Sequence, residues 1–591
     1  MAGEAIFTLI VVLLMVSALI TEFIEPDVIL FSTLGVLLIS GILTPKEAFE
    51  GFSNKGMLTV AVLFIVAYAA QLSGFMEIFF GRIMGNGAGY RKSLLKMMVP
   101  VMGLSAFINN TPLVAIFTPY IREWALKNKF APSKFLIPLT YAVSFGGLFT
   151  LIGTSTNLVV NGLLQQSAHA SLGMFELGIV GLPCGLVAAL FMAFYGHCLL
   201  PDNKDLSVEF PANGREYLLE MQVQQGSPLV GMTVEDAGLR NLEKLFLVEI
   251  VRNGESLVPV KPTDHVKAND MLVFTGLVDA IMQLQKIPGL VPRHGGDVYA
   301  DLHRSGNGRI IEAVVSPSSP MLGRTIKEGG FRSRYDAAVL AVHRHGERIV
   351  SKIGEIILKP GDTLLLLAGD NFFKIWNQSR DFYMVSKISN VAVLNKKKTV
   401  ISFIALFGMV SLSAFGVVEI FVGAIMATIL LLLTRCLTAV EARRSLELNV
   451  LIVIAASFGV SRAIEKTGLA SFLAEKIVDS MWNFGPVGVL TAIFIATTVI
   501  TEAVTNNAAA ALVFPVAIAA AVKLGVDPKP FAVAVAVAAS ASFMTTIGYQ
   551  TNMMVSGPGR YRARDFVRAG LPVKLIYVIV AIPVITVVWR L

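Results

Sequence analysis

The chain has 591 residues, of which 54% are hydrophobic and only 15% are charged, and its mean hydropathy is +0.69. Soluble globular proteins carry about 25% charged residues, so this composition excludes the ordinary soluble classes. The net charge of +8 comes from basic residues in short loops between apolar runs, which is typical of the cytoplasmic flanks of membrane proteins. We therefore predict a polytopic α-helical membrane protein that does not bind nucleic acid.

A transmembrane helix needs roughly 20 mostly apolar residues. The first such run follows Met1 directly, without a basic segment or a small-residue cleavage site, so we predict a membrane helix there and no removable signal peptide. The apolar runs lie at 5–22, 27–43, 56–73, 134–163, 174–200, 398–415, 417–434, 448–464, 484–500 and 569–590.

From about Asp202 to Lys398 the composition becomes polar, and no run is long enough to span a membrane. Two blocks there, beginning "GSPLVGMTVEDAGLR" and "SSPMLGRTIKEGGFR", match each other at an offset of 92, which aligns Asp270 with Asp362. This pattern indicates a tandem duplication. In each copy a strand pattern leads to Asn-Gly-Glu or His-Gly-Glu, a tight-turn signal, and then to further strands. We predict two small α/β domains, at 202–300 and 301–397.

The two blocks resemble TrkA-C domains, which form the C-terminal part of potassium-conductance regulators. The resemblance implies regulatory or dimerising domains that lie in the cytoplasm. The dinucleotide-binding domain that often accompanies them has no counterpart in this sequence, because no Gly-x-Gly-x-x-Gly follows a strand in the polar region. A bound nucleotide is therefore unsupported, and we predict no organic cofactor.

The apolar segments on either side of these domains also repeat each other. "AFINNTPLVAIFTPY" corresponds to "EAVTNNAAAALVFPV" at an offset of 396, which aligns Asn110 with Asn506. Further on, "TLIGTSTNLVV" corresponds to "TTIGYQTNMMV" at an offset of 395, which aligns Asn157 with Asn552. We predict two membrane repeats, at 1–201 and 398–591.

A helix that breaks at membrane depth frees N–H and C=O groups that lipid cannot satisfy, so the break must lie inside protein or beside water. Freed carbonyls and Asn oxygens suit sodium, while the N–H groups at the start of a half-helix suit an anion. Paired interruptions in corresponding halves indicate the binding site of a secondary transporter. A single buried Asn more often bonds a neighbouring helix, but repeated Asn motifs, each followed by Gly-x-x-x-Asn, favour a site.

These motifs resemble the divalent anion/sodium symporter family, whose members carry Ser-Asn-Thr at the tips of two re-entrant hairpins and often Thr-Pro-Pro-Asn in the loops that follow. Here the tips read "NNT" at 109–111 and "TNN" at 505–507, and the loops read "TSTN" at 154–157 and "YQTN" at 549–552. A further family signature matches from Ser540 to Val555, except that Thr546 replaces a proline. The resemblance implies two inverted repeats, an elevator-type transport domain and a homodimer.

The resemblance also implies one sodium ion at each tip and loop, with a divalent anion between the tips. The residues that it assigns to sodium are Asn109, Asn110, Gly153, Asn157, Thr505, Asn506, Gly548 and Asn552. The residues that it assigns to the anion are Asn110, Thr111, Ser155, Thr156, Asn506, Asn507 and Thr551. No metal other than sodium and no catalytic residue is predicted.

Asn507 and the "TSTN" loop depart from the dicarboxylate carriers of the family. Together with the TrkA-C blocks they look like its sulfate-transporting branch, so sulfate is the predicted anion. Neither tip contains Arg or Lys, so a buried dianion would need bound sodium to compensate its charge. Glu502, beside the second tip, is a candidate for proton coupling because it lies at membrane depth. We favour a role in which it bonds the backbone of the hairpin.

Three alternatives share parts of this pattern. A sodium-coupled carrier for dicarboxylates or another oxyanion would have the same architecture, and a sulfate sensor or regulator without significant transport would use the soluble domains to signal. A channel would need a TVGYG-like filter, which the sequence lacks. The sequence has neither His-Glu-x-x-His nor a Ser/His/Asp grouping near the repeated motifs, so no enzyme is predicted. Our prediction is a sodium/sulfate symporter of the cell (inner) membrane.

Overall fold

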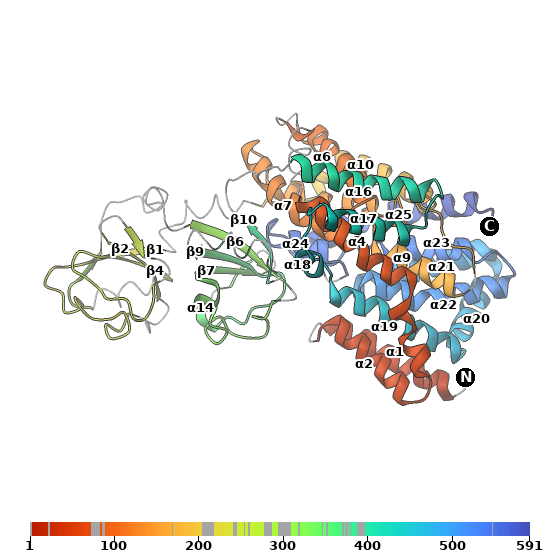
Figure 1. Cartoon of the computed structure of the whole chain (residues 1–591), viewed down its shortest axis with the longest axis horizontal. Coiled ribbons are helices and arrows are strands. Elements are labelled where there is room, and N and C mark those ends of the chain that lie inside the picture. Colours follow the sequence, from red (N-terminus) through yellow and green to blue (C-terminus); the bar gives the residue numbers. More distant parts are fainter. Residues whose placement is uncertain are drawn as a thin grey trace.

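The computed structural model contains a helical membrane part and two small sheets that extend from it (Figure 1). It describes residues 3–21, 24–72, 83–85, 89–167, 169–203, 218–239, 245–252, 255–257, 260–276, 287–292, 309–316, 319–344, 347–349, 351, 353–368, 372, 376, 379, 381–386, 396–546 and 548–591.

Two sets of helices flank the sheets in the sequence. Before the sheets lie α1 (Gly3–Thr21), α2 (Pro26–Ile39), α3 (Pro45–Phe49), α4 (Lys55–Leu72), α6 (Tyr90–Ser105), α7 (Asn110–Lys127), α8 (Leu136–Gly147), α9 (Ser155–Gln166) and α10 (Gly178–Leu199). After them lie α16 (Lys396–Ala414), α17 (Ile420–Leu433), α18 (Ala439–Arg444), α19 (Leu448–Lys466), α20 (Leu469–Met481), α21 (Gly485–Ala503), α22 (Asn506–Leu524), α23 (Lys529–Ala539), α24 (Gln550–Ser556) and α25 (Ala563–Val588).

Eight helices in the described parts of the chain are long and apolar enough to cross a membrane. The apolar runs predicted at 27–43 and 417–434 form shorter helices, since α2 and α17 have 14 residues each. The run at 134–163 is not one helix, because it is divided between α8 and α9. The break between them coincides with the "GTSTN" motif.

The two sets of helices match in their local chemistry. α3 and α18 both start with a capping box, in which the Thr44 or Thr438 hydroxyl accepts from the backbone three residues on and a Glu carboxylate bonds back to the Thr N–H. The two Thr residues are 394 positions apart, close to the offset of the tip motifs. The correspondence therefore extends well beyond the motifs themselves.

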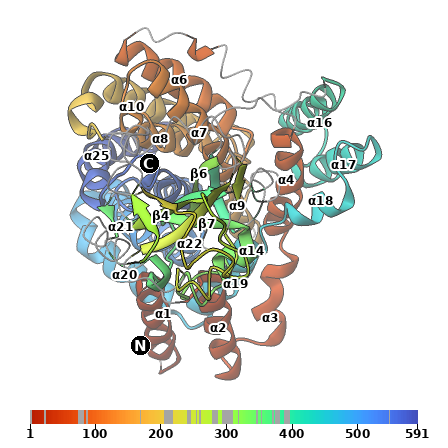
Figure 2. The ribbon, with the colours of Figure 1, turned by 90° about the vertical axis from the view of Figure 1, so that its left-hand side faces the viewer.

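One core joins the two halves of the membrane part. Phe543 lies between Tyr141 and Phe145, with ring centroids 5.3 and 5.1 Å apart, and Tyr577 stacks edge-on against Phe145 at 5.6 Å. α10 packs against α25, α6 and α8, whereas α16 and α17 pack on each other and on α4. Figure 2 shows this second group at one side of the bundle.

The two sheets have the same architecture. The first contains β1 (Leu218–Val223), β2 (Leu245–Arg252), β3 (Glu255–Leu257), β4 (Met271–Gly276) and β5 (Leu290–Pro292), in the order β3-β2-β4-β1-β5. The second contains β6 (Arg309–Val315), β7 (Ala337–Arg344), β8 (Glu347–Arg348), β9 (Thr363–Ala368) and β10 (Phe382–Ser386), in the order β10-β6-β9-β7-β8. Taken from its β8 edge, the second sheet has the order β8-β7-β9-β6-β10, which corresponds strand by strand to the order of the first sheet. All neighbouring strands that are paired in the two sheets are antiparallel.

Each sheet contains an Arg–Asp ion pair at the equivalent position. Arg252 donates to both oxygens of Asp270 at 2.8 and 2.7 Å, and Arg344 donates to both oxygens of Asp362 at 2.7 and 2.8 Å. Both carboxylates are fully buried, and each ion pair raises the pKa of its arginine. Two predicted turns, at 253–254 and 345–346, lie outside the described residues, and so does the predicted domain boundary at 300. The strands that flank each turn are described: Arg252 is the strand partner of Glu255, and Arg344 is the strand partner of Glu347.

The second sheet domain lies between the first domain and the membrane part (Figure 1). Arg332, on the short helix α14 (Phe331–Tyr335), joins the two domains. Its guanidinium donates to the carbonyl oxygens of Val260 at 2.6 Å and of Leu247 at 3.0 Å. These bonds connect the second domain directly to the backbone of the first.

Candidate functional site

The first tip is the break between α6, which ends at Ser105, and α7, which begins at Asn110. Asn109 caps α7, because its Oδ1 accepts the Asn110 N–H at 2.7 Å. Asn110 is only 2% exposed, and its Oδ1 lies 2.7 Å from Ser105 Oγ. The same hydroxyl lies 2.6 Å from the carbonyl oxygen of Val143 on α8. Tip 1 (residues 105–111) is thus fixed to the helix that precedes the first loop.

The second tip repeats this bonding 396 positions later. Thr505 caps α22 through its Oγ1, which accepts the Ala508 N–H at 3.4 Å. Thr501 Oγ1 lies 2.6 Å from the Ala539 carbonyl oxygen and 2.9 Å from the Asn506 amide. With its nitrogen turned inward, that amide also donates to the carbonyl of Gly548 at 3.1 Å. Tip 2 (residues 501–507) is therefore fixed to α23 as tip 1 is fixed to α8.

The two loops share one hydrogen-bond pattern. In loop 1 (residues 148–154), Asn157 Nδ2 donates to the carbonyls of Gly147 and Thr150, both at 2.9 Å. In loop 2 (residues 540–549), Asn552 Nδ2 donates to the carbonyls of Ser542 at 3.0 Å and Thr545 at 2.9 Å. Each Asn closes its loop over the start of the next helix, which explains why Asn recurs at this position.

The glycine of each loop is required by close packing. Gly153 and Gly548 donate to the hydroxyls of Thr150 and Thr545 at 3.1 and 3.2 Å. A Cβ on Gly153 would lie 2.5 Å from the Gly147 carbonyl oxygen, and one on Gly548 would overlap the Thr501 carbonyl oxygen. Both positions therefore exclude any side chain.

Each tip also reaches the opposite half, tip 1 at loop 2 and tip 2 at the start of α9, directly after loop 1. Asn110 Nδ2 donates to the hydroxyl of Tyr549 in loop 2. In the other direction, Asn507 Oδ1 accepts hydrogen bonds from Ser155 Oγ and Thr156 Oγ1, both at 3.1 Å. The structure thus brings the predicted residues of both halves into one connected polar cluster inside the membrane part.

Two oxygens in this cluster are buried without a hydrogen-bond partner in the part of the chain that the structure describes. They are Asn157 Oδ1 and Thr551 Oγ1, one on each side, and both residues are fully buried. An unpaired buried polar group costs about 1–3 kcal/mol. Such oxygens are ligands that a hard cation or a hydrated ion can satisfy.

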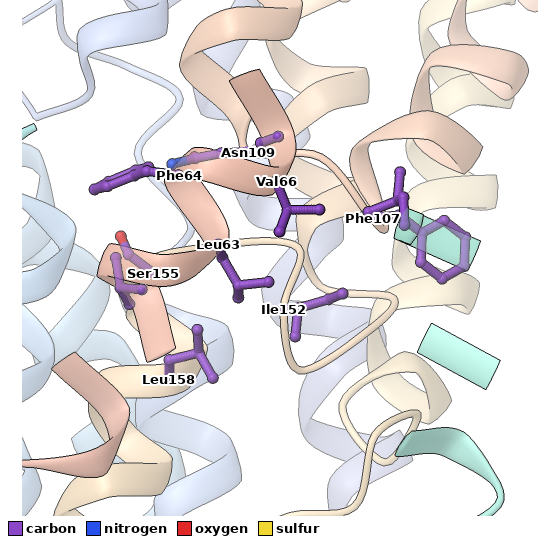
Figure 3. A pocket seen from close by; sticks show the side chains of 11 residues that line it. Leu63, Phe64, Val66, Phe107, Asn109, Ile152, Ser155 and Leu158 are labelled. Atoms are coloured by element: carbon purple, nitrogen blue, oxygen red, sulfur yellow. The ribbon is translucent and has the colours of Figure 1, made fainter. Parts of the chain in front are cut away.

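A pocket borders tip 1 on the side of α4 (Figure 3). Asn109 and Ser155 are its polar members, and apolar side chains line the rest. Leu63 and Phe64 of α4 and Leu158 of α9 contribute to this wall, as does Leu406 of α16. The sequence analysis did not identify this wall, because α4 is apolar on all sides and offers no distinguishing pattern.

Glu502 holds loop 2 in place, whereas the sequence analysis favoured a bond to the backbone of its own hairpin. Its carboxylate accepts the N–H groups of Phe543 and Met544 at 3.0 and 3.1 Å and the Thr545 hydroxyl at 2.9 Å. Lys574 of α25, which the sequence analysis missed, is a further partner of the Glu502 carboxylate. Its Nζ lies 3.0 Å from Glu502 Oε1 and donates to the Thr498 carbonyl at 2.6 Å. A lysine in the apolar part of α25, beyond the charged first turns of that 26-residue helix, was the signal that could have identified it.

Thr111, like Thr551, has a side chain that no hydrogen bond joins to another predicted site residue among those described. It lies half-buried on the first turn of α7. By offset it is the counterpart of Asn507, and its loop partner would be Thr551, whose hydroxyl is unpaired. The polar cluster is therefore asymmetric, with its unbonded hydroxyls on the side of Thr111 and Thr551.

These features define an integral membrane protein with the fold of a polytopic helical transporter. A family profile described as citrate transporter matches residues 10–538, so the chain belongs to the citrate transporter family. This agrees at the coarser level with the predicted resemblance to anion/sodium symporters.

Several relatives match almost the whole chain. A "Putative sulfur deprivation response regulator" of Chlamydomonas reinhardtii is 35% identical over 572 residues, covering 95% of this chain and 98% of the relative. "Sodium/sulfate cotransporter 1" of the same alga is 25% identical, covering 91% and 84%. "Uncharacterized transporter YfbS" of Escherichia coli (strain K12) is 29% identical, covering 99% of both chains. These descriptions are of transporters and a regulator, not of enzymes.

Proposed function

We propose that the protein is a sodium-coupled symporter of a divalent oxyanion, with sulfate as the first candidate. The observation that carries the proposal is the doubled set of tip and loop contacts, together with two buried oxygens that have no partner among the described residues: Asn157 Oδ1, at the first predicted sodium position, and Thr551 Oγ1, at a predicted anion position. The two repeated tip and loop positions suit two sodium ions, and the starts of α7 and α22 between them suit an anion.

The charge balance supports sodium as the coupling ion. Lys574, a cation next to tip 2, forms an ion pair with Glu502. The pair as a whole has no net charge. The anion would therefore be held by amides, hydroxyls and backbone N–H groups at the starts of α7 and α22. Bound sodium then supplies the positive charge that a buried dianion requires.

The roles of individual residues follow from their positions. Asn109, Gly153 and Asn157 would surround the first sodium ion, and Thr505, Gly548 and Asn552 the second, while Asn110 and Asn506 would contact both sodium and anion. The hydroxyls and amides of Thr111, Ser155, Thr156, Asn507 and Thr551 would bind the anion. The tip helices would move as part of an elevator domain in a homodimer of the cell membrane, with the sheet domains acting as cytoplasmic TrkA-C regulators.

Uptake of radiolabelled sulfate into proteoliposomes, driven by an inward sodium gradient and compared with equal potassium, tests this proposal. We expect accumulation with sodium alone and competition by selenate or molybdate. The family description makes citrate and succinate the necessary comparison. Accumulation of citrate or succinate in place of sulfate would keep the sodium-coupled carrier and overturn the choice of anion.

A regulator that senses sulfate is the second candidate, because the relative with 35% identity is described as a putative regulator of the sulfur deprivation response. In that case the same polar cluster would bind sulfate without carrying it across. Binding of sulfate to the purified protein by calorimetry, with no uptake of any tested anion in sodium, would favour this candidate over the symporter.

A further inference from the structure

The second sheet domain contacts α24 of the membrane part through the turn Gly361–Thr363, which leads into β9. Gly361 adopts a φ of +80°, and a Cβ on it would lie 3.1 Å from Met553 Cγ of α24. A Cβ on Gly557, directly after α24, would overlap the Thr363 hydroxyl and lie 3.2 Å from Thr363 Cβ. The turn therefore packs on α24 with no space between them.

The ion pair of this domain makes the turn rigid. Asp362 accepts two bonds from Arg344 of β7 and the N–H of Lys359 at 2.8 Å. Thr363 is fully buried, and its hydroxyl has no hydrogen-bond partner among the residues described. The domain thus presents a fixed surface to α24.

A second contact fixes the chain at the same place. Asn203, where α10 leads toward the sheet domains, donates from Nδ2 to the carbonyls of Gly559 at 3.0 Å and Arg560 at 2.8 Å. These carbonyls follow α24 directly. On the other side, the chain leaves the domains into α16, which packs on α17 and α4. The inserted domains therefore connect the α24 region to the separate group of helices that contains α4.

Two helices that contact the second domain, α24 and α7, begin at the candidate site. α24 starts at Gln550, next to Tyr549, and β10 of the domain lies against α7, which starts at Asn110 (Figure 1). The starts of the two helices are joined by the Asn110–Tyr549 hydrogen bond. α24 has only seven residues and is about 10 Å long, so a displacement at Gly557 reaches loop 2 through two helical turns.

We propose that the Gly361–Thr363 turn is the surface through which the soluble domains and the ion site control each other. When loop 2 binds or releases its ions, α24 shifts, and the contact with Thr363 tightens or loosens. By reciprocity, a ligand or partner that displaces the second domain alters the affinity of the site. The inference deepens the proposed function and relies on it only for the identity of the ions.

The first domain provides an internal comparison. Its equivalent turn, Asn269–Met271, has the same ion pair at Asp270, but it belongs to the domain that lies farther from the membrane part (Figure 1). Only the second copy can therefore transmit a change in the site directly.

The test is a pair of cysteines in the full chain, Thr363→Cys with Gly557→Cys, in a Cys198→Ser background because Cys184 and Cys436 are buried. The spacing of 3.2 Å between the Cβ atoms is close to the roughly 3.5–4.5 Å of a disulfide. The rate of oxidative crosslinking is measured in potassium, in sodium, and in sodium with sulfate or citrate. Met271→Cys with Gly557→Cys is the matched control and should not crosslink.

We expect rapid crosslinking whose rate changes by about fivefold or more when sodium and the anion are added, the lower end of ordinary coupling between two sites. Slow crosslinking in every condition would overturn the contact. Rapid crosslinking at one rate in all salts would overturn the coupling. Gly557→Leu, which should displace the domain, is expected to shift the sodium dependence of uptake, and an unchanged dependence would also count against the coupling.

This test is separate from the test of transport. A crosslinking rate that responds to sodium or sulfate in a protein without uptake would support the coupling and overturn the symporter. Uptake by the parent protein together with an unresponsive crosslink would leave the symporter in place and overturn the coupling alone.

Discussion

Lys574 Nζ lies 3.0 Å from Glu502 Oε1, although the two residues are 72 positions apart and lie on different helices. Their side chains are only 11% and 12% exposed. Tip 1 has no equivalent pair, because Ala106 stands at the position that corresponds to Glu502. Loop 2 is thus held by a buried charge pair and several further donors, whereas loop 1 relies on neutral hydrogen bonds.

Removing one partner of this pair should destabilise the protein strongly. Glu502→Gln and Lys574→Met each leave a buried charge unpaired, which costs about 3–5 kcal/mol in comparable cases. We expect a lower unfolding temperature in detergent for each single variant and partial recovery in the double variant. If Glu502→Gln is as stable as the parent and abolishes only a pH dependence of uptake, the proton-coupling role would be correct.

Asn110→Ala and Asn506→Ala should each abolish sodium-dependent uptake while leaving the protein folded. Each change removes an amide that ties a tip to a loop and, in the proposal, binds both an ion and the anion. Asn449→Ala is the control, because Asn449 is exposed and bonds only Glu25 at 3.3 Å among the described residues. Normal uptake by both tip variants would remove the tips from the site.

Thr551→Val and Thr156→Val separate binding from stability. The Thr551 hydroxyl is unpaired among the described residues, so its removal should not lower the unfolding temperature, whereas it should raise the sodium or sulfate concentration for half-maximal uptake about tenfold, or about 1.4 kcal/mol. The Thr156 hydroxyl bonds Asn507, so its loss should also cost about 1 kcal/mol of stability. Equal behaviour of the two variants would contradict the asymmetry of the cluster.

Asp362→Asn and Asp270→Asn compare the two sheet domains. Both substitutions break the same bidentate ion pair, so both should destabilise their own domain to a similar degree. Only Asp362→Asn loosens the turn that packs on α24, so only this variant should change the sodium dependence of uptake. The measurement is sodium titration of uptake in proteoliposomes, with limited proteolysis to compare the stability of the domains.

The sequence predicted the positions of the tips and loops because those positions repeat at fixed offsets, and the structure brings Asn110, Asn157, Asn506 and Asn552 into one buried region. The repeats could not predict which side chains meet. Aligning two copies pairs each tip with its own loop, whereas Asn110 bonds Tyr549 and Asn507 bonds Ser155 in the opposite half. Those contacts depend on how the copies interlock, which local sequence does not encode.

Other parts of the site had weak sequence signals for similar reasons. Lys574 follows a charged first part of α25 and acquires its role only from the approach of α25 to α21. The apolar wall at Leu63 and Phe64 is indistinguishable in sequence from a lipid-facing surface. The assignments of inverted repeats, TrkA-C domains and individual ion ligands remain predictions.

The crossing of the two halves also constrains how the protein is assembled. Asn110 and Tyr549 are separated by 439 positions, so during synthesis the first tip enters the membrane long before its partner exists. The amides of tip 1 must therefore be sheltered by water, by loop 1 or by the insertion machinery until the last helices arrive. A truncated chain that stops before α22 would contain the first motif complete and yet lack Asn507 and Tyr549, the partners of Ser155 and Asn110 on which the site depends.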